Sequence, residues 1–266
     1  MNNTMHKYTM ITGASSGLGK AFAIECAAMG RHIILMALPG GNTASLARGI
    51  ALQYGVDVQV FEFDLTDSQA LHHHLQHISE HYEVDFLINN AGVGGTSPLM
   101  ETAVESIDRI IQVNVRSTAL ITRLMLPLLL RNEKSYIMNI SSMAAFTPIA
   151  YKTVYPASKA FISSFSLGLK EEFAGTGLSV SVVYPGPMMT NSQTSRRIIG
   201  QGIKGKMGLL TATAIAQLAV RKTLAGSPII IPGFMNRVNH LLMSLLPAEW
   251  KLRIVSREVK KEIRYA

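Results

Sequence analysis

The segment from Tyr8 to Met29 constrains the fold of this chain more than any other. Tyr8 to Thr12 is a short apolar run typical of a buried strand, and Lys20 to Met29 is alanine-rich and helical, closed by Gly30. The sequence TGASSGLG at residues 12–19 joins them. A strand, a glycine loop and a helix in this order form a turn whose backbone N–H groups can bind a pyrophosphate. A purely structural turn is the alternative, because a glycine triplet alone is weak evidence.

Strand-like runs and helical stretches alternate through the rest of the chain. The apolar runs are residues 32–37, 58–63, 84–89, 136–140, 178–184 and 229–231. Helical stretches cover residues 106–130 and a segment that ends at Phe173. Regular alternation of this kind implies βαβ units and a parallel sheet. No linker or repeat divides the chain, so we expect residues 1–266 to form one α/β domain, a doubly wound parallel sheet in three αβα layers.

Three polar residues have the chemistry that carbonyl–alcohol redox catalysis needs. Tyr155 and Lys159 are four apart and share one face of a helix. Ser142 follows the run 136–140, so all three can converge at the C-terminal edge of a parallel sheet, where ligands bind. A phenol titrates at about 10, so Lys159 would stabilise its anion while Tyr155 moves the proton and Ser142 holds the substrate oxygen. A chance Tyr-x-x-x-Lys pair is the alternative.

Composition sets broad limits on partners and location. The formal charge of +8 and pI of about 9.6 suit an anionic partner, whether dinucleotide, membrane or nucleic acid. Basic and aromatic residues are not interleaved, so no nucleic-acid partner is expected. Cys26 is the only cysteine, which excludes an intramolecular disulfide and favours a cytoplasmic location. The N-terminus shows no signal-peptide pattern, and no apolar run is long enough to span a membrane.

The loop after residues 32–37 bears on the choice of nicotinamide cofactor. An NAD-preferring site usually offers an acid to the ribose hydroxyls at this point. Here the chain reads Leu38-Pro39-Gly40-Gly41-Asn42, with neither an acid nor an arginine. The last three residues could form an anion-binding loop for a 2′-phosphate, although a plain turn is the simpler interpretation. The missing acid favours NADP(H) over NAD(H).

Five histidines lie on one predicted helix after Asp67. They are His72, His73, His74, His77 and His81. The i, i+4, i+8 spacing of three of them can bind a transition metal. No nearby pattern of acids or cysteines completes a site, so a solvated helix face without a metal is expected. Asp67 or Thr66 would cap this helix.

Asn114 interrupts the apolar stretch 106–130. A buried amide is unfavourable unless its donors and acceptor find partners. The residue is therefore either a satisfied packing residue or part of a functional site.

Two segments near the C-terminus are candidates for contact with substrate or surfaces. Residues 191–207 are polar and glycine-bearing, a predicted substrate lid or otherwise a surface loop. From Arg237 onward there are seven Lys or Arg and three Glu, a net charge of +4, with an apolar helical stripe before Pro247. Residues 234–266 thus form a basic amphipathic extension. It can lie on an anionic membrane, pack over the cleft or pack against another subunit.

These motifs together resemble the short-chain dehydrogenase/reductase superfamily, the single-domain Rossmann type with TGxxxGxG and YxxxK motifs. The match runs from about Lys7 to Ile231. The ordered set is TGASSGLG at 12–19, Asp64, NNAG at 89–92, Asn114, Ser142, YPASK at 155–159 and PGPMMT at 185–190. An ordered set on a βαβ pattern is far more specific than any one motif. Leu38 is a departure, since many NADP-using relatives carry arginine there.

The resemblance implies a Rossmann fold that binds NAD(P) in a homo-dimer or homo-tetramer. It casts Tyr155 as general acid/base, and Lys159 as the ammonium that lowers the tyrosine pKa and holds the nicotinamide ribose. Ser142 would polarise the carbonyl, and Asn114 would position a water in a proton relay. The implied cofactor contacts are Gly13, Ser15, Ser16, Gly17, Leu18 and Gly19 around the pyrophosphate, Asp64 and Leu65 around the adenine, Asn90, Ala91 and Gly92 around the adenosine ribose, and Pro185, Gly186 and Thr190 toward the nicotinamide.

The predicted function is NAD(P)(H)-dependent interconversion of a ketone or aldehyde and an alcohol. The expected pocket neighbours are apolar and adaptable, which favours a small hydrophobic substrate such as a lipid, steroid or aromatic ketone. They are Met143, Phe146, Tyr151, Met188 and Met189. The alternative is a non-catalytic NAD(P)-binding regulatory or membrane-surface protein that retains the fold. The complete Asn-Ser-Tyr-Lys set argues against it, because a binder does not need the tyrosine.

Overall fold

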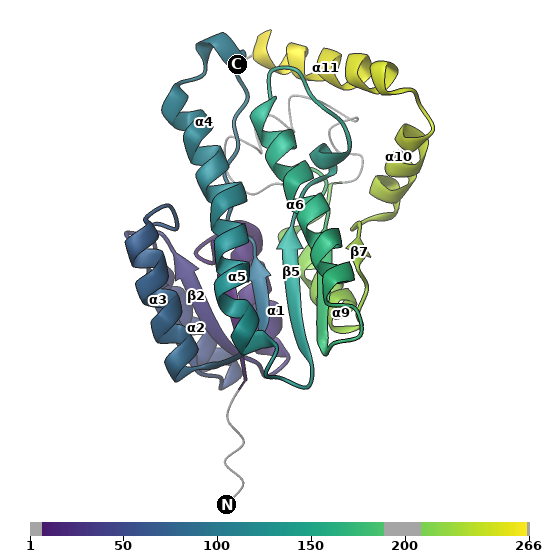
Figure 1. Ribbon diagram of the computed structural model, residues 1–266. Helices are drawn as coiled ribbons and strands as arrows, with labels where there is room; N and C mark the ends of the chain where they lie inside the picture. The colour runs from purple at the N-terminus through teal and green to yellow at the C-terminus, as the bar shows by residue number, and fades with distance from the viewer. Residues whose placement is uncertain (1–6, 189–208, 265–266) are drawn as a thin grey trace, which may run out of the picture.

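A seven-stranded parallel sheet runs through the computed structural model, which describes residues 7–188 and 209–264 (Figure 1). In chain order the strands are β1 (Lys7–Thr12), β2 (His32–Ala37), β3 (Val58–Glu62), β4 (Glu83–Asn89), β5 (Ser135–Ile140), β6 (Leu178–Val183) and β7 (Ile229–Ile230). Their order across the sheet is β3-β2-β1-β4-β5-β6-β7, and each neighbouring pair is parallel. The predicted doubly wound sheet is confirmed.

The inner strands are buried on both faces, which explains why their sequences are mostly apolar. Ile33 and Leu35 of β2 pack into a cluster with Phe22. Ile34, between them, points to the opposite face and packs into a second cluster with Leu71. A strand that alternates between two apolar layers is apolar at nearly every position, so the sheet forms the middle layer.

Helices cover both faces of the sheet (Figure 1). One layer holds α1 (Gly17–Ala28), α2 (Thr43–Tyr54) and α9 (Ala212–Leu224), whose side chains join the first apolar cluster. The other layer holds α3 (Ser68–His81), α5 (Ser117–Leu129) and α6 (Val154–Glu172), which contribute to the second. Asp67 caps α3 by accepting the N–H groups of Gln69 and Ala70. The sequence pattern did not delimit α2 or α9.

One predicted helix boundary was wrong. The first helix begins at Gly17, not Lys20, because Gly17 and Gly19 lie in its first turn. The predicted helical stretch 106–130 is helical from Val104 to Leu129, but a π-turn at Gln112–Arg116 separates α4 (Val104–Ile111) from α5. The extra residue of a π-turn is invisible in an apolar pattern, and such turns are frequent at functional sites.

The sheet reverses its winding between β1 and β4, where the strand order changes direction. The loops after those strands part to opposite sides, and the crevice between them is the usual ligand site of an open α/β sheet. The loop at residues 13–16 and the loop that begins at Asn90 both lie at this edge.

The chain ends in α10 (Phe234–Ser244) and α11 (Ala248–Arg264), which follow β7. Figure 1 shows this pair at the end of the molecule where the strands terminate, with α11 crossing near the first turns of α6. The N–H of Ala150 donates to the Ser256 hydroxyl at 3.1 Å, which joins α11 to the loop before α6. Within the described ranges, no helix combines the length and apolar character needed to cross a bilayer.

Candidate active site

The loop between β1 and α1 is held in a tight turn. Gly13 has a φ of +64°, and a Cβ on Gly19 would lie 2.1 Å from the carbonyl oxygen of Gly13. The Asn90 side chain donates to the carbonyl oxygens of Thr12 and Gly13 at 3.0 and 3.2 Å. In return, the Thr12 hydroxyl accepts the N–H groups of Asn90 and Ala91, both at 3.0 Å. These bonds clamp the ends of β1 and β4 together, and only glycine fits at position 19.

The N-terminus of α1 points to the same edge of the sheet. Ser16, its N-cap residue, makes no side-chain hydrogen bond to the first turn. Uncapped N–H groups at a helix N-terminus carry partial positive charge and bind phosphate well. Leu18, in this first turn, lines the main cavity. Residues 13–19 therefore fit the pyrophosphate of a dinucleotide.

The loop after β2 lies against the glycine loop. A Cβ on Gly41 would lie 3.5 Å from the Thr43 hydroxyl and 3.6 Å from the Cβ of Ser15. Thr43 is fully buried at the start of α2, and its hydroxyl has no hydrogen-bond partner among the described residues. Asn42, the N-cap residue of α2, makes no side-chain cap. A second helix N-terminus with unused hydrogen-bonding groups thus adjoins the first.

Asp64 and Leu65 follow β3 on the far side of this crevice. Asp64 forms an ion pair with Arg109, with Oδ2 and Nη1 3.2 Å apart, and its Oδ1 accepts the N–H and hydroxyl groups of Thr66. Partial burial raises the pKa of Asp64, but these hydrogen bonds and Arg109 outweigh it and hold the pKa below its ordinary value. Leu65 is buried in the core. The predicted adenine wall therefore carries a carboxylate that Arg109 already neutralises.

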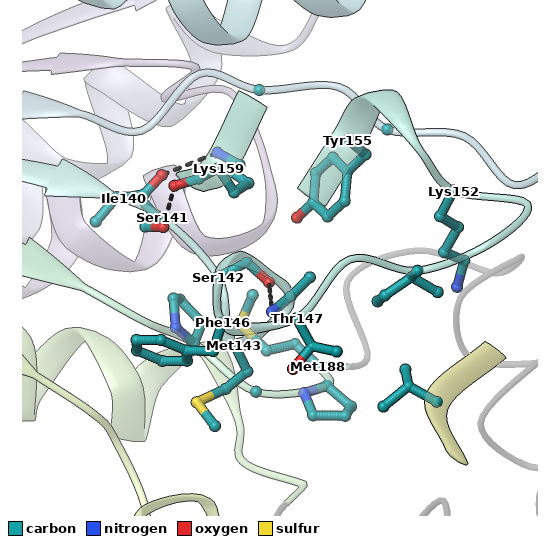
Figure 2. Close-up of a pocket in the computed structure, with 18 of the residues that line it drawn as sticks. Ile140, Ser141, Ser142, Met143, Phe146, Thr147, Lys152, Tyr155, Lys159 and Met188 are labelled. Atoms are coloured by element: carbon teal, nitrogen blue, oxygen red, sulfur yellow. Dashed lines mark hydrogen bonds between the residues drawn. The ribbon is translucent and has the colours of Figure 1, made fainter. Parts of the chain in front are cut away.

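Tyr155, Lys159 and Ser142 meet at the C-terminal edge of the sheet (Figure 2). Tyr155 and Lys159 lie in the first turns of α6, and Ser142 follows β5 as the N-cap of the short helix η3 (Met143–Phe146). The Ser142 Oγ accepts the N–H of Ala144 at 3.1 Å, which leaves its O–H group to donate toward Tyr155 or a bound oxygen. The Lys159 Nζ donates to the carbonyl oxygen of Ile140 at 2.9 Å and lies 6.0 Å from the centre of the Tyr155 ring.

Burial controls the protonation of this cluster. Desolvation raises the pKa of Tyr155, and a hydrogen bond with Ser142 lowers it by less. Desolvation lowers the pKa of Lys159 to about 8. At neutral pH the phenol is therefore neutral, in the form that donates a proton, and the lysine is mostly an ammonium.

Asn114 lies in the π-turn, and its amide makes three hydrogen bonds within the protein. Its Oδ1 accepts the N–H of Val93 at 2.8 Å, while its Nδ2 donates to the carbonyl oxygen of Val93 and to the hydroxyl of Ser158, both at 2.9 Å. A Cβ on Gly92 would lie 3.3 Å from this Oδ1 and 3.2 Å from the Lys159 Nζ. The side chain thus fixes the Gly92–Val93 backbone against α6, close to the lysine.

A cavity of about 870 Å³ opens in front of Tyr155 and Lys159. Of the predicted neighbours, Met143, Phe146 and Met188 line it, as do Pro185 and Gly186. The C-terminal helices supply the opposite wall, with Asn239, His240, Met243 and Val255. The ring of His240 packs on Phe146 with centroids 4.0 Å apart. The extension therefore packs over the cleft, one of the alternatives left open by the sequence.

Tyr151 lines a second, smaller cavity of about 370 Å³ on the other side of Tyr155. Its φ of +67° is unusual for a residue with a side chain and implies about 1–3 kcal/mol of local strain. The carbonyl oxygen of Tyr151 accepts the N–H of Ser97 at 2.8 Å, which holds this conformation. Lys152 lines both cavities, so the strained turn places it between them.

Several supporting residues were missed by the sequence reasoning. Ser141 donates to the carbonyl oxygen of Lys159 at 2.7 Å, and Asn139 forms a buried hydrogen-bond chain with Asn89 and Ser166 beneath the site. Asn236 of α10 is buried so close to Gly186 that a Cβ there would lie 2.6 Å from its Nδ2. The only sequence signal for Asn139 and Asn89 was an asparagine near the end of an apolar strand.

The remaining residues that the sequence singled out are not part of this site as described. Among residues 7–188 and 209–264, no group of three or more histidine, cysteine or acidic residues could hold a metal ion. On α3 the rings of His77 and His81 stack, and His81 Nδ1 lies 2.8 Å from the carbonyl oxygen of His77. Thr190, Met189 and the predicted lid 191–207 lie outside the described residues.

Comparison with known proteins shows which family this chain matches. The family described as short chain dehydrogenase matches residues 7–198. A very-long-chain 3-oxoacyl-CoA reductase of Anas platyrhynchos is 35% identical over 182 residues, which cover 67% of this chain and 58% of that relative. The chain thus spans less than two thirds of this relative's length.

Solved structures share the fold across nearly the whole chain. A 7beta-hydroxysteroid dehydrogenase superposes with a TM-score of 0.85 at 23% identity, covering 94% of this chain and 96% of its own. The bulky-bulky ketone specific alcohol dehydrogenase of Comamonas testosteroni has a TM-score of 0.76 at 26% identity and covers 92% and 96%. A short-chain dehydrogenase of Sphingobium yanoikuyae in complex with NADPH has the same TM-score and identity and covers 91% and 97%.

The predicted superfamily and reaction class are confirmed by these matches and by the fold. Family members are dehydrogenases and reductases, and solved ones bind NADP or NAD. This chain belongs to the short-chain dehydrogenase family of NAD(P)-dependent oxidoreductases, which act on carbonyl and alcohol groups.

Proposed function

We propose that this protein reduces a hydrophobic ketone or aldehyde with NADPH, and catalyses the reverse oxidation, with Tyr155 as the general acid/base. One observation carries the proposal: a neutral, half-buried phenol, a serine hydroxyl and a lysine adjoin one cavity at the switch point of the sheet. The two uncapped helix N-termini and the glycine cradle beside them fit a dinucleotide. When bound, the nicotinamide supplies hydride for reduction and accepts it in oxidation.

The side chains divide the remaining chemistry among them. Ser142 donates a hydrogen bond to the substrate oxygen, and Tyr155 transfers its phenolic proton to it. Lys159 has three N–H donors, of which one is taken by the carbonyl oxygen of Ile140. The other two remain for the nicotinamide ribose and for stabilising the phenolate as the proton leaves.

Asn114 acts as a positioning residue in this scheme. Val93 and Ser158 occupy both N–H donors of its amide, so any water that it holds for a proton relay must donate to an oxygen of this residue. Its carbonyl oxygen accepts the Thr118 hydroxyl at 3.1 Å and retains a second lone pair.

The preference for NADPH is supported by the loop after β2. It offers no carboxylate that would repel a 2′-phosphate, and it brings Ser15 and the uncapped start of α2 together. Asn42→Asp is expected to weaken NADPH binding by about tenfold or more and leave NADH binding little changed, since the new carboxylate would repel the 2′-phosphate. Gln53→Glu, the same change of charge at an exposed position near the other end of α2, is the matched control.

The hydrophobic substrate is supported by the cavity and by the relatives. Methionine, phenylalanine and valine side chains line part of the cavity before Tyr155, and such surfaces adapt to bulky apolar ligands. Relatives named for very-long-chain 3-oxoacyl-CoA and for bulky-bulky ketones fit the same class. A panel in which sugars or small polyols turn over much faster than hydrophobic ketones would contradict this part.

The proposal also includes an oligomeric state and a cellular location. A homo-dimer or homo-tetramer is supported by exposed apolar residues on α4 and α6, among them Ile111, Phe161 and Leu167. A cytoplasmic location suits the single, buried thiol of Cys26. The C-terminal extension is proposed to contact a membrane surface.

The decisive experiment is a titration of the purified protein with NADPH and with NADH, followed by nicotinamide fluorescence, and then turnover of a carbonyl panel. Tight NADPH binding, weaker NADH binding and reduction of hydrophobic ketones are expected. A preference for NADH would refute the cofactor assignment. Cofactor binding without any turnover would favour a regulatory protein that retains the fold.

A further inference from the structure

The outward faces of α10 and α11 expose an unusual amount of apolar surface. Six large side chains on these helices are between 47 and 75% exposed: Phe234, Leu241, Leu242, Leu245, Trp250 and Ile254. Along α10 and its C-cap residue, residues 234, 238, 241 and 245 recur at helical spacing, so they form one stripe. Surface apolar residues scattered singly need no explanation, but six of them on two consecutive helices indicate an interaction site.

The inward faces of the same helices are already occupied. Asn236 is buried against Gly186, and His240 and Met243 line the main cavity. On α11, Ser256 accepts the N–H of Ala150 and Val259 is buried. The helices therefore cannot rotate to hide the outward stripe without dismantling the wall of the cavity.

The charges beside the stripe indicate what covers it. Arg237, Arg253 and Arg257 are exposed, and the chain from residue 237 onward carries a net charge of +4. A second copy would bring like charges together, which opposes self-association. A surface of anionic lipid would neutralise them, and Trp250 suits the boundary between headgroups and acyl chains.

We propose that the outward face of α10 and α11 binds the surface of a membrane that contains anionic phospholipid. The helices lie in the plane of the interface, with the apolar stripe inserted and the arginines at the headgroups. This assigns the proposed membrane contact to one face and six side chains.

The position of this face has a consequence for substrate supply. The two helices that rest on lipid also form one wall of the cavity in front of Tyr155. A hydrophobic ketone dissolved in the bilayer would thus reach the site along the bound face. This consequence rests on the proposed catalytic function, whereas the membrane binding does not depend on catalysis.

Vesicle co-sedimentation of the full-length protein tests the docking. We expect binding to phosphatidylcholine vesicles that contain phosphatidylserine, weaker binding to pure phosphatidylcholine, and a loss of binding with salt. The triple variant Leu241→Gln, Leu245→Gln, Trp250→Gln should bind at least about tenfold more weakly. Leu52→Gln, which alters a leucine 87% exposed on α2, should bind like the wild type.

A charge variant separates the electrostatic contribution to vesicle binding from the apolar one. Replacing Arg253 and Arg257 by glutamine should weaken binding to the anionic vesicles by about fivefold per charge, with little effect on pure phosphatidylcholine. Both variants should retain cofactor binding, which shows that they fold. Tyr155→Phe should bind vesicles like the wild type, so failure of the catalytic proposal would leave this one intact.

Two results would overturn the inference. One is no binding to anionic vesicles by the wild type, and the other is equal binding by the wild type and the triple variant. If the wild type does not bind vesicles and the triple variant forms a smaller oligomer in sedimentation velocity, the stripe is a subunit interface.

Discussion

The two walls of the main cavity are built in opposite ways. The wall that carries Tyr155, Lys159 and Ser142 belongs to the sheet edge and α6, where most polar groups are buried and hydrogen-bonded to neighbouring elements. The wall that carries His240, Met243 and Val255 belongs to two peripheral helices with exposed outer faces. The first wall is packed against neighbouring elements. The second is held by a few contacts, such as those of Asn236 with Gly186 and of Ser256 with Ala150.

The two walls are therefore suited to different tasks, the first to the chemical step and the second to the choice of substrate. Proton transfer depends on sub-ångström placement, which a rigid core provides. Selection among apolar substrates depends on the shape of a wall, which a peripheral element can change without disturbing the sheet. Variants of the first wall should therefore abolish turnover, and variants of the second should redistribute it among substrates.

The largest effect is expected for Tyr155→Phe. Removing the phenolic hydroxyl removes the proton donor, so turnover should fall by about 10³-fold or more. The binding of NADPH, measured by fluorescence, should change little, because the glycine cradle is untouched. Retention of even a tenth of the wild-type rate would show that another group moves the proton.

Next in size is Gly19→Ala. A Cβ at this position would lie 2.1 Å from the carbonyl oxygen of Gly13, so the cradle must open and cofactor binding should be lost. Gly49→Ala is the control, since a Cβ there meets nothing within 4 Å. That variant should bind NADPH normally and unfold at a slightly higher temperature, because alanine favours helix by about 1 kcal/mol.

Lys159→Met should abolish turnover and yet stabilise the fold. Burial lowers the pKa of Lys159 from 10.5 to about 8, a penalty on its charge of about 3 kcal/mol. Since the unfolded chain holds the proton more tightly, the wild type should gain stability as the pH rises from about 8 toward 10.5, and the variant should lack this gain. Denaturant unfolding at both pH values measures it; a variant less stable at pH 7 would contradict it.

The smallest effect is expected on the peripheral wall. Met243→Ala should change kcat/KM for bulky ketones by about tenfold while small ketones and NADPH binding are little affected. Met235→Ala, on the same helix but outside the cavity lining, is the matched control. Equal losses on small and bulky substrates would show that the two walls are not separable.

The pH dependence of the reaction distinguishes its two directions. Because the pKa of Tyr155 is raised by burial, the neutral phenol persists through neutral pH and supports reduction. Oxidation requires the phenolate, so its rate should rise with pH. Measuring both directions with one substrate pair checks the sign, and oxidation fastest at low pH would contradict the assignment of Tyr155.

The sequence by itself determined the parts of this protein that depend on local pattern. Apolar runs of strand length set the parallel sheet, the glycine spacing set the first turn, and the four-residue spacing placed Tyr155 and Lys159 on one helix face. Each of these follows from periodicity over a few residues. The membership of the family followed from their order.

Only the tertiary structure decided how distant segments meet. It placed Asn114 on the Val93 backbone through a π-turn, closed Asn90 onto the glycine loop, and set α10 and α11 over the cavity. It also decided the ionisation of Lys159, because a pKa depends on how much water the surrounding elements exclude. Such contacts join residues far apart in the chain, so no local pattern encodes them.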